Sequence, residues 1–547
     1  MEQLHFGLLS ILPPLLTIVL AVVTKDVIVS LFVGILSGTL IAAGGNPYYA
    51  LVRLSDLLAD TLADGWNIRI MMFTVLLGLL VGMLSRTGAA YSLGDWASKR
   101  IKTKTGALLF TWVFGLLIFF DDYFNSLTIG TCMRPLCDAK KISRAKLAYI
   151  LDSTAAPVAI MAPISTWVVY VIGTYKDIPE FQSLGLGEMS FFVRTIPYNL
   201  YAIFAVLMVL FITLTHKDFG PMARSEARAQ KGLGLYDEEK FGAVSSQVES
   251  KAMTNNAKPF DFLIPIAALI VMALFFFPMT TWMNAIDGEE ITSIGQAMAA
   301  IPFGTAFNDT DSSMALMYAA VFANVFAYIY YVARKLLNIK NAADALMDGF
   351  RAMVPAVMIL TLAWSIGTII KSDRPDGGVG LAAYVSEIVI NGNFPMWLLP
   401  LVVYIFSCLI SFAAGTSWGT MGIMIPIAVP VMIQLARNGG LDPNQVINAT
   451  ALTIGAVMGG SVFGDHCSPI SDTTVLSSTG AAVPHLEHVA TQLPYAVFVA
   501  FCVMVGTIVS GLTWNPIPGL IATAILFVAG TFLLSKTFGE NKYDLSK

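Results

Sequence analysis

The sequence has little charge. Asp, Glu, Lys and Arg make up 12% of its 547 residues, whereas 56% are hydrophobic. Soluble domains carry about 25% charged residues, so the composition excludes a soluble globular protein and indicates a polytopic helical membrane protein. The net charge of −4 and the lack of a strongly basic region give no sign of nucleic-acid binding. The longest polar stretch, 216–258, is predicted to be a cytoplasmic charged loop.

Several chemical signatures are missing as well. The five cysteines form no CxxC pair, so we interpret them as buried, reduced side chains. There is no P-loop, which argues against ATP-driven chemistry, and we expect no enzymatic activity. The N-terminus lacks a basic region followed by a cleavage site, so the first apolar stretch is predicted to remain as a membrane span.

One polar motif interrupts an apolar run at 464–474, with the sequence Gly-Asp-His-Cys-Ser-Pro-Ile-Ser-Asp-Thr-Thr. A charge inside a membrane costs about 2.5–3.5 kcal/mol on insertion scales, so this cluster indicates an ion or substrate site. Pro469 breaks the helix and frees backbone carbonyls that can bind a cation. Ser471, Asp472 and Thr473 add oxygens suited to a hard cation such as Na⁺.

Parts of this motif have simpler interpretations. Asp465 and His466 could be only a satisfied polar pair, although we favour a functional pair inside a span. His466 and Cys467 suggest zinc, yet no CxxC or HxxxH partner supports a structural metal. The segment 485–488, His-Leu-Glu-His, falls in a predicted cytoplasmic loop and is interpreted as a solvated turn or a point of proton access.

Windows of about 20 apolar residues predict about 11 membrane spans. They lie at 6–23, 28–43, 70–85, 147–173, 191–215, 259–278, 312–333, 352–370, 447–479, 489–512 and 516–535.

Basic residues place a further apolar segment, 106–133. The flanking loops 86–104 and 134–146 each carry five Lys or Arg, and basic loops stay in the cytoplasm. The segment is therefore expected to enter and leave on one side, as a re-entrant hairpin with its tip at 121–126.

Segment 395–436 has few basic residues beside it, so we predict a second hairpin from the opposite face, with its tip at 413–420. The other loops agree with this layout, because 216–258 carries seven Lys or Arg and 279–311 carries none. An N-terminus outside and a cytoplasmic C-terminus satisfy both loops.

The two halves carry similar features in the same order. Asn125-Ser126 aligns with Thr416-Ser417, and 162–166 aligns with 468–473. Because the predicted topology reverses between the halves, we expect an all-α fold of inverted repeats, each with a re-entrant hairpin and a broken helix. The predicted parts are a first repeat at 1–215 with broken helix 147–173 and scaffold helix 191–215, the loop 216–258, a second repeat at 259–512 with broken helix 447–479, and a terminal span and tail at 513–547.

Transporters with this plan bind substrate near the membrane midplane, between hairpin tips and unwound helices. Asp121 and Asp122 repel each other, which would let a proton and a cation compete for them; alternatively they end a helix in interfacial water. Asp152, Ser153 and Thr154 could instead form a helix N-cap. The candidate ion- or substrate-binding residues are Asp121, Asp122, Asn125, Ser126, Asp152, Ser153, Thr154, Thr416, Ser417, Asp465, His466, Ser468, Ser471, Asp472 and Thr473.

The stretch 464–478 resembles the signature of the NhaC family of Na⁺/H⁺ antiporters, within the ion transporter superfamily. Stretches 119–126 and 152–157 also resemble that family, and the resemblance covers most of the chain. It implies Na⁺/H⁺ exchange across a bacterial inner membrane by a moving transport domain. It also implies a cation-coupling role for Asp465 and Asp472, and further for Asp121, Asp122 and Asp152.

Two functions stay open at this stage. The first is a Na⁺/H⁺ antiporter working by alternating access, in which Na⁺ and protons compete for intramembrane carboxylates; the Na⁺ site candidates are Asp465, Asp472 and Asp121. The second is a Na⁺- or H⁺-coupled transporter or exchanger of a small organic solute, such as an amino acid or a carboxylate. No cofactor is expected beyond Na⁺ as cargo or coupling ion. A homodimer in the lipid bilayer is expected by analogy alone.

Overall fold

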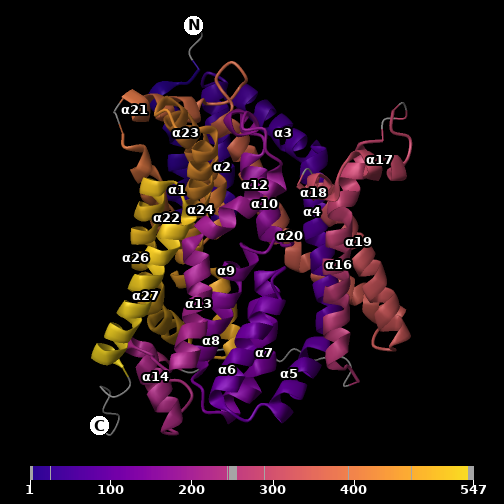
Figure 1. Cartoon of the computed structure of the whole chain (residues 1–547), viewed down its shortest axis with the longest axis vertical. Coiled ribbons are helices and arrows are strands. Elements are labelled where there is room, and N and C mark those ends of the chain that lie inside the picture. Colours follow the sequence, from indigo (N-terminus) through magenta and orange to yellow (C-terminus); the bar gives the residue numbers. More distant parts are fainter. Residues whose placement is uncertain are drawn as a thin grey trace.

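The computed structural model describes residues 4–539, except for 25, 243, 245–255, 287, 289, 309, 392–393 and 470. Its regular elements are helices throughout, and no strand occurs among the described residues. In this part of the chain nine helices are long and apolar enough to cross a membrane, or ten if one bent pair counts as a span. The predicted all-α polytopic membrane fold is confirmed. The two chain ends lie at opposite ends of the molecule (Figure 1).

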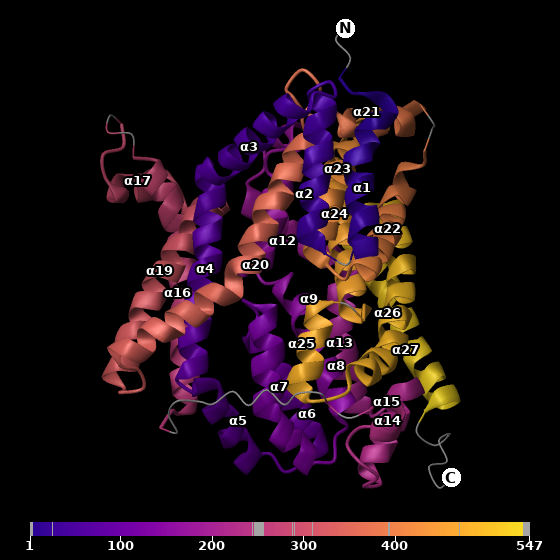
Figure 2. The ribbon, with the colours of Figure 1, turned by 180° about the vertical axis from the view of Figure 1, so that it is seen from behind.

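Most long helices run between these two ends of the molecule (Figures 1 and 2). They are α4 (Gly65–Arg86), α16 (Pro259–Asn284), α19 (Ser312–Ala333), α20 (Ile339–Lys371), α26 (His485–Thr513) and α27 (Pro516–Phe538). The bent pair consists of α12 (Glu188–Thr195) and α13 (Leu200–Thr215), which meet at 54°. Short elements complete the chain: a 3₁₀ turn at Gly7–Ile11, α3 (Pro47–Ala63), α11 (Pro179–Gln182), a 3₁₀ turn at Ile196–Tyr198, α17 (Ile294–Ala300), α18 (Phe303–Asn308), α21 (Leu381–Asn391) and a 3₁₀ turn at Met396–Leu398.

The first two apolar helices are shorter than the hydrocarbon core of a membrane is thick. Helix α1 (Leu12–Thr24) has 13 residues and α2 (Val27–Ala42) has 16, so they measure about 20 and 24 Å against a hydrocarbon core of about 30 Å. Asp26 ends the apolar run because its carboxylate caps α2 by accepting from the Val29 N–H at 3.0 Å. Both helices lie in the half of the molecule that carries the N-terminus (Figure 2).

Two helical hairpins occupy opposite halves of the molecule, as the basic-residue pattern predicts. Helices α6 (Lys104–Leu117) and α7 (Asp122–Ala139) lie in the half near the C-terminus, whereas α22 (Leu399–Ala414) and α23 (Ser417–Asn438) lie in the other half (Figure 1). Helix α6 has only 14 residues, but both arms of the second hairpin are among the nine long apolar helices.

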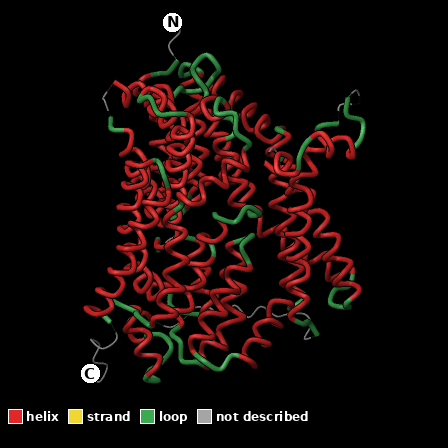
Figure 3. The backbone as a smooth tube through the Cα atoms, viewed as in Figure 1, coloured by secondary structure: helices red, strands yellow, loops and turns green. Residues whose placement is uncertain are grey.

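Both predicted broken helices are present. The first consists of α8 (Arg144–Thr154), α9 (Ala156–Ala159) and α10 (Thr166–Tyr175), and the second of α24 (Pro443–Cys467) and α25 (Asp472–Ala481). In each, an irregular stretch separates helices from the two halves of the molecule (Figures 1 and 2; loops are green in Figure 3). The structure thus has the expected elements in the expected order, while the repeat boundaries stay a prediction.

Two predicted loops contain helices. The basic stretch 86–104 holds α5 (Ala89–Arg100), and the charged stretch 216–258 holds α14 (Gly220–Gln230) and α15 (Glu238–Phe241). The interpretation of 216–258 as a charged loop is wrong for α14, which packs against the other helices, whereas α15 has no buried residue.

Buried ion pairs hold α14 and the residues before it in place. Glu226 is fully buried, accepts from Ser143 Oγ at 2.7 Å and pairs with Lys104 Nζ at 2.5 Å. Asp218 pairs with the buried Lys146 on α8. A buried charge is tolerated when it is paired and hydrogen-bonded, so the charges that suggest a solvated loop in the sequence act here as internal links.

Candidate functional site

Close helix contacts bring the tips and breaks together. A Cβ at Gly464 would lie 2.3 Å from the backbone N of Phe412, so α24 touches α22 directly. Likewise, a Cβ at Gly130 would lie 2.6 Å from the Cα of Gly480, which places α7 against α25. Small residues allow such close approach between membrane helices. The second broken helix therefore lies against both hairpins, with α24 on α22 of its own half of the chain and α25 on α7 of the other half.

Asp465 lies in the last turn of α24 and is 5% exposed. The break in the helix folds back over it: Ser471 Oγ donates to its carboxylate, and Thr474 Oγ1 donates to its carbonyl at 3.0 Å. Thr473 Oγ1 lies 3.0 Å from Ser471 Oγ. Ser468, at the start of the break, is also fully buried. The break thus gathers a carboxylate and several hydroxyl oxygens, which is a donor set suited to Na⁺.

Other carboxylates surround Asp465 within electrostatic range. They are Asp472, Asp122 and Asp152. Asp472 differs from the rest because it is exposed, and Tyr123 Oη donates to it at 3.4 Å. Asp465 is therefore the buried member of the Asp465–Asp472 pair, and Asp472 lies at its outer side.

Asp121 and Asp122 begin α7 at the tip of the first hairpin. Asp121 caps the helix by accepting from the Phe124 N–H at 2.7 Å. The two residues are 3% and 4% exposed, so the alternative of a helix-end pair in interfacial water is wrong. The structure places both carboxylates in the interior, with Asp122 within electrostatic range of Asp465.

Asn125 joins the hairpin tip to the first broken helix. Its Nδ2 donates to the carbonyls of Gly115 at 2.8 Å, Ile118 at 3.1 Å and Thr154 at 2.9 Å. Its Oδ1 and the Oγ of the neighbouring Ser126 are buried without a hydrogen-bond partner. Two oxygens at this tip are therefore available to a ligand, whereas the hydroxyl of Thr154 donates to its own helix at Ile150.

The second tip has no charge. Thr416 caps α23 by accepting from the Gly419 N–H at 3.4 Å, and Ser417 Oγ donates to the Ser461 carbonyl at 3.1 Å. The residues 415–419 also match the GxSxG pattern of hydrolases. In those enzymes the serine follows a strand, but here Ser417 follows the helix α22, so this match does not indicate a nucleophile elbow.

His466 does not pair with Asp465. Its Nδ1 lies 2.9 Å from Tyr201 Oη, and its Nε2 lies 2.9 Å from Ser153 Oγ. Successive residues of a helix point about 100° apart, so the two side chains face different neighbours. Cys467 also turns away, since its Sγ donates to the Phe463 carbonyl of its own helix at 2.9 Å.

Asp152 lies at the C-terminal end of α8, so the alternative of a helix N-cap is wrong. The residue before α9 is Ala155, which provides no side-chain cap. Gln492 Nε2 donates to Asp152 Oδ2 at 2.6 Å, while Oδ1 is buried without a hydrogen-bond partner. Sequence reasoning missed Gln492. The signal was present, because His488 and Gln492 are polar residues one helical turn apart at the start of an apolar span.

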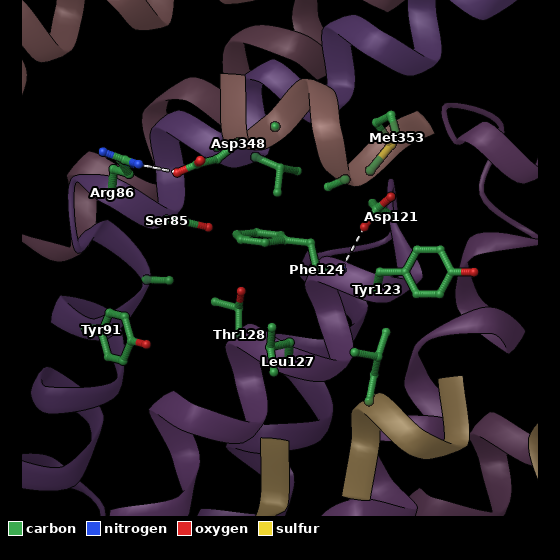
Figure 4. Close-up of a pocket in the computed structure, with 16 residues that line it drawn as sticks. Ser85, Arg86, Tyr91, Asp121, Tyr123, Phe124, Leu127, Thr128, Asp348 and Met353 are labelled. Atoms are coloured by element: carbon green, nitrogen blue, oxygen red, sulfur yellow. Dashed lines mark hydrogen bonds and ion pairs between the residues drawn. The ribbon is translucent and has the colours of Figure 1, made fainter. Parts of the chain in front are cut away.

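A cavity of about 480 Å³ opens beside this cluster, between α4, α5, α7, α20 and α25 (Figure 4). Asp121 and Tyr123 lie on one side of it, and the ion pair of Arg86 with Asp348 lies on another. The cavity therefore connects the acidic hairpin tip with a polar rim.

Among the described residues, no group of three or more His, Cys, Asp or Glu side chains is arranged to hold a metal ion. A cation at Asp465 would instead be held by one carboxylate with hydroxyl and carbonyl oxygens.

This fold and this site define a multi-pass membrane transporter. Broken helices, hairpin tips and buried carboxylates meet inside the bilayer-spanning part, as they do in secondary transporters. The model of the Na⁺/H⁺ antiporter family matches residues 158–512. The chain belongs to this family, and the expected family is confirmed.

The chain is also similar to individual proteins. The chain is 35% identical to an uncharacterized protein of Haemophilus influenzae, over 98% of this chain and 97% of that one. It is 28% identical to the malate-2H⁺/Na⁺-lactate antiporter of Bacillus subtilis, over 47% of this chain and 45% of the relative. Among solved structures, the YdaH transporter of Alcanivorax borkumensis is 12% identical with a TM-score of 0.47, covering 86% of this chain and 90% of that one.

Proposed function

We propose that this protein exchanges Na⁺ for protons by alternating access. The observation that carries the proposal is the buried Asp465, enclosed by the hydroxyls of the broken helix and facing further carboxylates. Like charges this close favour binding of either a proton or a cation. Competition between the two for one cluster is the requirement for their exchange.

The geometry supports different roles for the acids. Asp465 with Ser471 and Thr473 provides the oxygen-rich position for Na⁺, and Asp472 at its outer side would receive the ion. At the cavity, Asp121 would receive the ion, and we assign Asp122 a position between Asp121 and Asp465. Asp152 is hydrogen-bonded to the Gln492 amide and lies 3.9 Å from the His488 imidazole, so we assign it to the proton.

We place the protein in a bacterial inner membrane, with the N-terminus outside. This placement is supported by the basic residues near α5 and α14, which lie at the end of the molecule that carries the C-terminus (Figure 1). A cysteine introduced at Met298, which is 51% exposed on α17, should react with an impermeant thiol reagent from outside. Labelling only from the cytoplasm would contradict this orientation.

The cavity favours a second candidate function, exchange of a small organic solute coupled to Na⁺ or protons. Its volume of about 480 Å³ far exceeds the need of one ion, because a water molecule takes up about 30 Å³ in the liquid. A named relative is an antiporter of organic acids. An amino acid or a small carboxylate would fit the polar rim and the apolar walls.

Reconstitution into proteoliposomes separates the two functions. An imposed Na⁺ gradient is applied while internal pH is recorded, first alone and then with pools of amino acids and organic acids. If Na⁺ alone drives proton movement, the antiporter function is supported. If internal pH stays constant until one solute is added, the protein is a coupled solute carrier and the same acids are its ion site.

A further inference from the structure

Two histidines, His488 and His485, extend in sequence from Asp152 toward the surface. His488 Nε2 is 3.9 Å from Asp152 Oδ2. His488 Nδ1 is 2.8 Å from Ser478 Oγ, which is 3.0 Å from His485 Nδ1. His488 is fully buried and Ser478 is 3% exposed, whereas His485 is partly exposed. Hydrogen bonds thus join His485, Ser478 and His488, and a step of 3.9 Å separates His488 from the buried carboxyl.

The hydrogen-bond partners fix the tautomer of His488. Gln492 Nε2 faces two acceptors, the Asp152 carboxylate and the His466 carbonyl, so the orientation of its amide is determined. Gln492 Oε1 then lies 2.7 Å from His488 Nε2. An amide oxygen can only accept, so His488 Nε2 carries a hydrogen and Nδ1 is bare when the imidazole is neutral.

The tautomer of His485 is also fixed by its hydrogen-bond partners. Its Nε2 lies 2.7 Å from the Pro469 carbonyl, which can only accept, so Nδ1 is bare in the neutral ring. Two bare nitrogens and the Thr474 carbonyl, at 2.8 Å, thus face the hydroxyl of Ser478. One hydroxyl hydrogen cannot satisfy three acceptors. One extra proton on either ring would supply the missing donor.

We propose that His485, Ser478 and His488 form the route by which protons reach Asp152 from the end of the molecule that carries the C-terminus. This inference rests on the proposed function, for which it names the proton pathway. The route explains why a hydroxyl with two lone pairs lies between two rings, and why the rings approach a carboxyl that pairs with no Lys or Arg in the described part of the chain.

One proton moves along the route from water to Asp152. A proton from water binds His485, so that Nδ1–H donates to Ser478 Oγ. The hydroxyl hydrogen of Ser478 moves to His488 Nδ1 while Ser478 takes the proton of His485. His488 then holds hydrogens on both nitrogens, and when its ring moves away from Gln492 Oε1 it releases the one on Nε2 to Asp152 Oδ2, which lies 3.9 Å away in the structure. No bond between heavy atoms changes, the single positive charge moves inward, and His488 resets when its ring turns.

Among the residues that the structure describes, no Lys or Arg side chain contacts the route. The titratable groups that face His488 are Asp152, His485 and His466, and His466 is bonded to Ser153 and Tyr201. Glu487 turns away and accepts from Ser225 Oγ and the Asp237 N–H. Arg144 binds the Ala482 carbonyl at 3.0 Å, which fixes the turn that carries His485.

The test compares two transport modes in proteoliposomes of the full chain. Na⁺-driven proton movement requires the route, whereas exchange of ²²Na⁺ for Na⁺ does not. We expect His488→Gln and Ser478→Ala to slow Na⁺-driven proton movement by about tenfold or more, with ²²Na⁺ exchange unchanged. Ser478→Thr should restore the rate because it keeps the hydroxyl. His216→Gln, an exposed histidine bonded to Thr105, is the matched control.

The outcomes separate the two proposals. Wild-type protein that exchanges ²²Na⁺ for Na⁺ without moving protons would overturn the proposed function. If the wild type moves protons, then equal losses of both modes in the variants would show a structural role and overturn the route. Proton movement at the wild-type rate in His488→Gln would also overturn it. His485→Ala should be slowed likewise and recover when imidazole is added outside the vesicles.

Discussion

The two hairpin tips have nearly the same backbone conformation but differ in charge. Asp121 caps α7 at φ −152° and ψ 124°, and Thr416 caps α23 at φ −147° and ψ 126°. Each side-chain oxygen accepts from the N–H three residues further on, at 2.7 Å and 3.4 Å respectively. One tip thus places a buried carboxylate where the other places a neutral hydroxyl.

This difference separates the structural role of a tip from its charge. Thr416 shows that a hydroxyl is sufficient to begin a helix at this position, so capping does not require the carboxylate of Asp121. A buried charge that the fold does not need is a functional candidate. The comparison therefore predicts that the first tip binds the ion and that the second tip positions the broken helix.

The largest effect on stability is expected for Asn125→Ala. The substitution leaves three buried carbonyls, those of Gly115, Ile118 and Thr154, without their donor. We expect a loss of about 2–3 kcal/mol in the free energy of unfolding, since each buried unsatisfied group costs about 1–3 kcal/mol and local relaxation recovers part of the sum. Unfolding in detergent measures it.

Ser417→Ala in the second tip is the matched control. The Ser461 carbonyl keeps its bond from Ser411 Oγ at 2.6 Å, so the loss should be about 1 kcal/mol or less. Equal losses for the two variants would contradict the view that the first tip is linked more tightly to its broken helix.

Asp121→Thr is expected to have the next largest effect, and on transport rather than stability. The hydroxyl keeps the cap but removes the charge, so Na⁺-driven proton movement should fall about tenfold, or about 1.4 kcal/mol. The unfolding temperature should change little. Wild-type transport by this variant would mean that Asp121 only caps α7.

The smallest effect is expected for Thr416→Ala. Loss of a helix cap typically costs about 1 kcal/mol, and the 3.4 Å bond here is long, so the loss should be smaller still. Thermal unfolding and transport should both stay close to wild type. A large loss of transport would show that the neutral tip contacts the cargo.

Much of the fold follows from the sequence because membrane helices need long apolar runs and basic loops fix their direction. The hairpin tips and the break at Pro469 were predicted for this reason. The packed helix α14 is not predictable in this way. A charged stretch has the same composition whether its acids face water or, like Glu226, are buried in an ion pair.

The site was predictable in its residue types but not in its pairs. Polar residues inside apolar runs mark Asp465 and Asp152. The sequence also suggests that Asp465 pairs with His466. The two side chains do not pair, because neighbouring residues of a helix point in different directions. The actual partners, Ser471 for Asp465 and Gln492 for Asp152, depend on how the breaks fold and on which helix packs beside them.

The most direct test of the account is Na⁺-driven proton movement by Asp465→Asn in proteoliposomes, measured beside wild type and across pH. The asparagine keeps the size of the side chain and can still bond to Ser471, so the fold should be retained. We predict that the exchange is lost at every pH. Exchange at the wild-type rate, with its pH dependence intact, would contradict the assignment of Asp465 as the ion-binding carboxylate.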